Sequence, residues 1–189
     1  MQNRFMKQFA KKLSSCILVL AIAAASCKKT GSPNVEADHA AITTLTLSFS
    51  QNGAVVSSAT FDDPDGFGGN APVRFDSVRL AANSNYTMTV TLQNKTSGTV
   101  TDMTDEIRRA GNQHEFYFLP TSGLTFNATK LDRDVNGFPL GFNNSVSTGA
   151  ASNGSILVKL MHKPLLKGPN DAPTVGHSDI EVNFRTFIQ

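Results

Sequence analysis

Tryptophan is absent from this sequence, tyrosine occurs only twice, and cysteine occurs only at positions 16 and 27. An aromatic platform for sugars would have to use phenylalanine, and most of the 13 phenylalanines fall in strand-like runs that favour a buried core. Beyond residue 27 no cysteine remains, which excludes a disulfide, a thiol nucleophile and a CxxC metal site there. Stability must therefore come from core packing.

Signatures of common enzyme classes are also missing. The sequence contains no GxSxG, HExxH, GxGxxG or Walker-type phosphate loop. Its paired acidic residues fall in turn-like segments, without a pattern that would place two carboxylates across a cleft. We therefore expect a protein that is not an enzyme.

The first 26 residues have the three parts of an export signal: a basic start without acids, an apolar run over 16–25, and a small-residue exit before Cys27. The apolar run is shorter than the roughly 20 residues that a membrane-spanning helix needs. Cys16 has a similar local motif, but no apolar segment precedes it. We predict a lipoprotein signal over 1–26 with lipidation of Cys27. The alternative is an ordinary signal peptide cleaved near Ala25.

Removal of this signal reverses the net charge of the chain. The segment holds four of the 17 basic residues and none of the 15 acidic ones, so the mature chain carries 13 basic residues and a net charge of −2. No basic patch with interleaved aromatics remains, so we expect no nucleic-acid partner.

Beyond a polar tether at 27–40, apolar and polar residues alternate with a period of two from residue 41 to the end. Nine such runs are separated by turn signals, and Asn52-Gly53 is typical of a hairpin. One stretch, 102–110, has helical spacing with acidic residues first and basic residues last. This pattern predicts a single domain over 41–189, an all-β, Ig-like or fibronectin-like sandwich of about nine strands with one short helix.

Tyr86 stands six residues after Leu80, at the start of the clearest alternating strand. This spacing is typical of the tyrosine corner of Ig-like sandwiches, in which the hydroxyl bonds back to the preceding corner. An ordinary half-buried tyrosine is the alternative.

The chain also resembles a group of small Bacteroidota lipoproteins over most of its mature length. The resemblance is carried by LAANxxYT at 80–87, HEF at 114–116, DxxxNGFPLG at 132–141, HKP at 162–164 and SDIEV at 178–182. Gln113-His114-Glu115 differs from the Glu-His-Gln order of the group. The resemblance implies no activity. Some members are labelled as having a type 1 periplasmic binding fold, but this chain is too short and too rich in strand patterns for that two-lobed fold.

Two constellations could hold a metal ion. Asp132, Asp134 and Asn136, followed by Gly137, have the alternating oxygens of the first half of a calcium loop. Asn143 stands where an EF-hand would have glutamate, so ordinary turn chemistry is the alternative.

The second constellation is formed by histidine. His114 and His162 fall at the ends of predicted strands, where loops gather. With a carboxylate such as Glu115 or Asp179 they could bind zinc or copper, provided that the fold brings them together. Structural or surface histidines are the alternative.

These patterns predict a lipid-anchored protein of the cell envelope that acts as a binding or interaction module. Lys28-Lys29 replaces the acidic run that marks surface-exported lipoproteins in some phyla, which favours the outer membrane, facing the periplasm. The expected partners are the membrane, through Cys27, and an outer-membrane receptor or another envelope protein. Two alternatives are an accessory lipoprotein that binds zinc or copper for an uptake system, and a calcium-stabilised structural domain.

Overall fold

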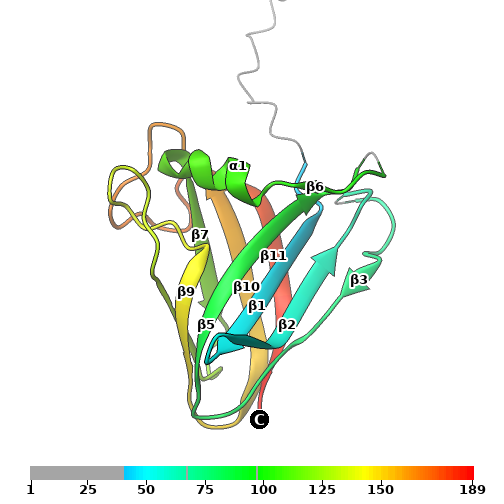
Figure 1. Ribbon diagram of the computed structural model, residues 1–189, viewed down its shortest axis with the longest axis vertical. Helices are drawn as coiled ribbons and strands as arrows, with labels where there is room; N and C mark the ends of the chain where they lie inside the picture. Colours follow the sequence, from blue (N-terminus) through cyan, green and yellow to red (C-terminus); the bar gives the residue numbers. More distant parts are fainter. Residues whose placement is uncertain (1–40, 67, 97) are drawn as a thin grey trace, which may run out of the picture. The chain divides into compact units, whose positions relative to one another are not determined.

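The computed structural model describes residues 41–66, 68–96 and 98–189, so the predicted signal and tether lie outside the described residues. The described chain forms two sheets that enclose one core, and the predicted all-β sandwich is confirmed (Figure 1). The larger sheet has the order β3 (Arg74–Phe75), β2 (Ala54–Asp62), β1 (Thr44–Gln51), β5 (Asn85–Asn94), β9 (Asn143–Thr148), β8 (Phe126–Lys130), with β6 (Thr101–Asp102) paired to β5. The smaller sheet has the order β4 (Val78–Leu80), β11 (His177–Ile188), β10 (Ser152–His162), β7 (His114–Pro120).

The strands form where apolar side chains alternate with polar ones, because every second side chain of a strand points to the same face. In β5 the buried positions are Tyr86, Met88, Val90 and Leu92. In β11 they are Ile180, Val182, Phe184, Thr186 and Ile188. These inward rows from the two sheets pack against each other and build the core.

The two ends of the sandwich differ. Asn52 and Gly53 form the two-residue turn between β1 and β2, with φ values of 50° and 80° that a type I′ turn requires. We call this the hairpin end, which lies at the bottom of Figure 1. At the other end β1, β7 and β11 begin, β5 and β10 finish, and the helix α1 (Thr104–Arg109) crosses above the strands (Figure 1). We call it the helix end.

Several predicted boundaries were wrong. The alternation over 73–80 predicts one strand, but it forms two, because β3 pairs with β2 whereas β4 pairs in parallel with β11 in the other sheet. A strand is also predicted over 138–146, but β9 begins only at Asn143, since a loop precedes it. The described residues contain eleven strands instead of nine, because of this division and because the two-residue β6 has no detectable period. The predicted helix over 102–110 is shorter, and a 3₁₀ turn, η1 (Gly111–Gln113), follows it.

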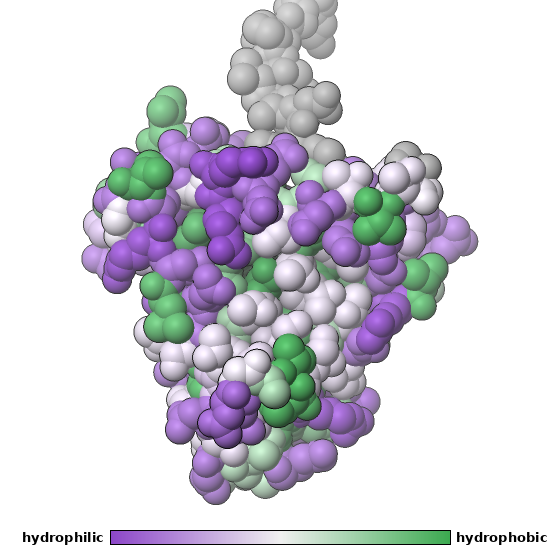
Figure 2. Space-filling view, viewed as in Figure 1, coloured by the Kyte–Doolittle hydropathy of each residue, from purple (hydrophilic) through white to green (hydrophobic). Residues whose placement is uncertain are grey.

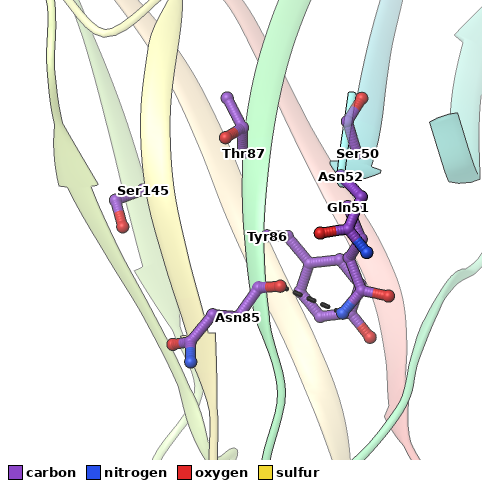
Figure 3. Close-up of a pocket in the computed structure, with 7 residues that line it drawn as sticks. All are labelled: Ser50, Gln51, Asn52, Asn85, Tyr86, Thr87 and Ser145. Atoms are coloured by element: carbon purple, nitrogen blue, oxygen red, sulfur yellow. Dashed lines mark hydrogen bonds between the residues drawn. The ribbon is translucent and has the colours of Figure 1, made fainter. Parts of the chain in front are cut away.

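Tyr86 makes the contact that a tyrosine corner requires. Its hydroxyl accepts a hydrogen bond from the backbone N–H of Ala81 at 2.9 Å, and its ring packs edge-on against Phe49. A hollow of about 440 Å³ beside it is lined by polar side chains of β1, β5 and β9, and Gln51 Nε2 donates across it to the Asn85 carbonyl at 3.0 Å (Figure 3). Tyr86 is the only titratable residue lining this hollow, which therefore offers little chemistry.

Candidate metal centre

Three neighbouring strands bring a pair of histidines and a carboxylate together at the helix end. His114 is the first residue of β7, His162 is the last residue of β10, and the two are directly paired across the sheet. Asp179 lies near the start of β11, on the other side of β10. The residues are far apart in the chain, so the sheet order alone makes them neighbours.

Asp179 reaches this group because of a β-bulge. Leu160 pairs with Ile180 and Met161 pairs with Ser178, so Asp179 is the extra residue, with no partner across the ladder. Without the bulge, alternation would place Asp179 on the same face as the exposed Glu181, away from the core. A bulge re-aims a side chain, and here it directs the carboxylate towards His114.

The three side chains are close and shielded from solvent. The rings of His114 and His162 are stacked, with centroids 4.7 Å apart and planes 11° from parallel. One ring nitrogen from each histidine and one oxygen of Asp179 all lie within 4.8 Å of one another. Both histidines are buried, and the Asp179 side chain is only 11 % exposed. The structure therefore places the predicted pair with Asp179, one of the two carboxylates suggested by the sequence.

The backbone fixes the orientation of His114. Its Nδ1 lies 2.8 Å from the carbonyl oxygen of Ala110, the residue that follows α1. Because a carbonyl oxygen only accepts, Nδ1 carries a hydrogen, and Nε2 faces Asp179 Oδ2 at 3.3 Å. Metal-binding histidines are commonly held by such a second bond from the other ring nitrogen to a backbone carbonyl. The carbonyl of Ala110 thus orients the His114 ring so that its Nε2 is directed towards Asp179, where a cation could bind.

His162 links the buried pair to the surface. Its Nδ1 lies 3.1 Å from Nε2 of His177, and its Nε2 lies 3.2 Å from Oε1 of Gln113. His177 is exposed and stands nearly perpendicular to His162, with ring centroids 4.9 Å apart. Neither His177 nor Gln113 was predicted as a site residue. The signal that could have found His177 is its pairing with His162 across β10 and β11.

The spacing is near that of a metal site. In a tetrahedral site with zinc–nitrogen distances of 2.0–2.1 Å, neighbouring ligand atoms lie about 3.4 Å apart. The separation of His114 Nε2 and Asp179 Oδ2 already has this value. The His162 nitrogen would have to approach by at most about 1.4 Å, and in binding the metal it would give up its hydrogen bond to His177 or to Gln113.

Glu115, the other suggested carboxylate, lies on the opposite face of β7 in a separate buried network. Its carboxylate pairs with Lys130 and, at 3.0 Å, with the fully buried Nζ of Lys163, which also lies 3.4 Å from Asp171 Oδ2. Burial raises the pKa of the Tyr117 hydroxyl, which donates to Glu115 at 2.7 Å, and the nearby charge of Glu115 raises it further. Burial lowers the pKa of Lys130 in spite of its ion pair. Glu115 is therefore engaged with cations of the protein itself.

The predicted calcium loop uses its oxygens internally. Both carboxylate oxygens of Asp132 accept backbone N–H groups, at 2.8 and 3.0 Å. One oxygen of Asp134 accepts the backbone N–H of Asn136 at 2.8 Å, and the other lies 2.9 Å from Lys167 Nζ. Burial alone would raise the pKa of Asp134, but the bonds from Lys167 and the backbone outweigh it and hold this pKa below 3.8. A lysine ammonium occupies the position next to Asp134, which favours the turn interpretation.

No helix in the described part of the chain is long and apolar enough to cross a bilayer. No family model matches the chain, and no curated protein or solved structure shows significant similarity to it. Its function must therefore be inferred from its own residues.

Proposed function

We propose that the mature chain is a lipid-anchored envelope protein that binds a divalent transition-metal ion through His114, His162 and Asp179. The observation that carries the proposal is the convergence of two buried histidines and a re-aimed aspartate at adjoining strand ends. Burying a carboxylate beside imidazoles is costly unless a cation or proton compensates it. A metal ion bound between them would supply the positive charge that compensates the Asp179 carboxylate.

The ligand types select the metal. Two imidazoles and one carboxylate, without a thiolate, suit Zn²⁺ or Cu²⁺, which prefer nitrogen and oxygen donors, over soft Cu⁺. Three protein ligands leave a fourth position open, as in sites that exchange ligands. His177 lies at the rim of the site, beside His162. Such a site supports reversible binding and passage of the ion to a partner.

The anchor and the location complete the proposal. Lipidation of Cys27 would hold the domain at a membrane, because an acyl pair anchors firmly where a single chain does not. We propose the outer membrane, facing the periplasm, with an outer-membrane metal-uptake receptor as the partner. In this proposal the domain is an Ig-like variant that presents its binding site without catalysing a reaction.

The experiment is calorimetric titration of the mature protein with ZnCl₂ and with CuSO₄, after removal of any polyhistidine tag. We expect one ion per chain, and at least about a tenfold loss of affinity in His162→Gln and in Asp179→Asn. His39, the fourth histidine of the chain, supplies the control His39→Gln, which should bind normally. Circular dichroism verifies that each variant is folded. Equal affinities in all folded variants, or no binding at all, would show that the cluster is purely structural.

A further inference from the structure

Exposed aliphatic side chains at the helix end include those of Val135, Leu165 and Leu166. Val135 is 89 % exposed, Leu166 is 59 % exposed, and Leu165 is fully exposed. They belong to two loops, 131–142 between β8 and β9 and 163–176 between β10 and β11, which lie side by side at the upper left of Figure 1. Figure 2 shows separate hydrophobic patches over the same region.

The two loops are braced against each other and against the sandwich. Lys167 Nζ lies 2.9 Å from Asp134 Oδ2, and both side chains are almost completely buried. The same ammonium group donates to the carbonyl oxygen of Gly111 in η1 at 2.7 Å. A buried ion pair with a further hydrogen bond fixes the positions of the loop tips, so the exposed side chains are held out by rigid supports.

Leu165 is held in an unusual backbone conformation. Its φ is 62°, in the left-handed region that side chains other than those of glycine, asparagine and aspartate rarely adopt. Strain of this kind persists where the surroundings enforce it, and it clusters at functional segments. Here the strained residue is a leucine whose side chain lies outside the core.

Arginines surround the base of the same loops. Arg108, Arg109 and Arg133 line a hollow of about 380 Å³, together with Val135. Asp132 and Asp134 also line it, but Asp132 is occupied by backbone N–H groups and Asp134 by Lys167. The exposed acids of α1 lie one turn before Arg108 and Arg109 and do not line the hollow. The hollow therefore offers guanidinium donors to an anion, and phosphate suits them well.

The chain enters the domain at this same end. β1 begins there with Thr44, and 17 residue steps separate Thr44 from Cys27 (Figure 1). Even fully extended, that segment spans no more than about 60 Å. A lipid on Cys27 would therefore keep the helix end, where the chain enters the domain, within about 60 Å of the membrane surface.

We propose that the helix end docks on the bilayer that holds Cys27. The tips at Val135, Leu165 and Leu166 insert at the interface, and the arginine hollow takes the phosphate of an anionic lipid. Hydrophobic tips with flanking basic residues bind membranes by this combination of burial and charge attraction. The docking rests on the proposed lipid anchor but not on metal binding. It would hold the His114–His162 site close to the membrane plane.

The test uses the lipidated mature protein, whose cysteine at position 27 is blocked by the lipid. A single cysteine is introduced at Asn136, between the tips, or at Ala150, an exposed residue near the hairpin end. Each is labelled with an environment-sensitive dye and reconstituted into phosphatidylethanolamine vesicles with and without phosphatidylglycerol. Lipids with quenchers at the headgroup–acyl boundary should quench the dye at Asn136→Cys and leave the dye at Ala150→Cys unaffected. Equal quenching at both positions, or none at either, would overturn the docking.

Three further variants separate the apolar and the electrostatic contributions to docking. In the Asn136→Cys background, Leu165→Asp should abolish the quenching, whereas Val55→Asp, at another exposed aliphatic position near the hairpin end, should not. In vesicles with phosphatidylglycerol, Arg109→Gln should lower the ratio of docked to undocked protein about fivefold, which is the contribution of one basic residue near an anionic surface. Added salt should reduce this difference between the variant and the parent. If Leu165→Asp leaves the quenching intact, the Leu165 tip does not insert and the proposed docking mode is wrong.

Failure of the docking is distinguishable from failure of the proposed function. Loss of the lipid anchor would appear as absence of the protein from floated vesicles, before any quenching is measured. Metal binding is measured independently, by titration in detergent. A protein that floats and binds zinc but shows no quenching at Asn136→Cys would contradict the docking alone.

Discussion

Lys163 offers a sharp test of the energetics of this fold. It follows directly after β10, its side chain is fully buried, and its ammonium contacts Glu115 at 3.0 Å and Asp171 at 3.4 Å. Lys163→Met keeps the length of the side chain but removes the charge. Glu115 then remains buried with one cation fewer, and Asp171 loses its ion pair.

The magnitude follows from the burial. Removing one partner of a buried ion pair costs 3–5 kcal/mol, and because Glu115 retains Lys130 we expect about 3 kcal/mol. For a domain of this size, that corresponds to a melting temperature about 6–12 °C lower. The matched control is Lys159→Met, in β10, whose partner Glu181 is 43 % exposed. This surface pair should contribute only about 0–1 kcal/mol.

The assay is urea unfolding followed by far-ultraviolet circular dichroism at the strand band, because the chain has no tryptophan to report by fluorescence. The double variant Lys163→Met with Glu115→Gln should be less unstable than the sum of the two single changes, by at least about 1 kcal/mol. If Lys163→Met is no more destabilising than Lys159→Met, burial does not strengthen the ion pairs of Lys163, and the reasoning is wrong.

Three further predictions concern other parts of the sandwich. Tyr86→Phe should destabilise by about 1 kcal/mol, because the N–H of Ala81 loses its acceptor; an unchanged urea midpoint would refute this. Burial alone would raise the pKa of Asp62, but hydrogen bonds, chiefly from Lys95, hold it below 3.8, so the resulting stability is present above this pH and is lost as the pH falls through the lowered value. Asp62→Asn should therefore be less stable than the parent at neutral pH, with a gap that closes below about pH 3.8 in acid titration. Asp132→Ala should lower the melting temperature equally in calcium and in chelator, and a calcium-dependent difference would restore the calcium interpretation.

The strands of this fold were predictable because their signal is local. The alternation that starts at Tyr86 and the Asn52-Gly53 turn each reflect backbone geometry within a few residues. The division at 73–80 was not, because both halves look extended and only the sheets to which they pair distinguish them.

The candidate site was predictable only in part. His114 and His162 stand out as histidines at strand ends, but their pairing depends on the order of β7, β10 and β11, which no local pattern encodes. The bulge turns Asp179 inwards, whereas the alternation of the surrounding residues predicts an outward-facing side chain at that position. Lys163 would be placed on the surface by its residue type, because a buried lysine requires partners that only the folded chain supplies.

X-ray absorption at the zinc edge tests the central claim most directly. We expect the zinc-loaded mature protein to show two imidazole ligands and a carboxylate oxygen, all at about 2.0–2.2 Å. His162→Gln should lose one imidazole contribution and retain the other. A spectrum without imidazole scattering, or one that is identical in His162→Gln, would contradict a metal centre formed by His114, His162 and Asp179.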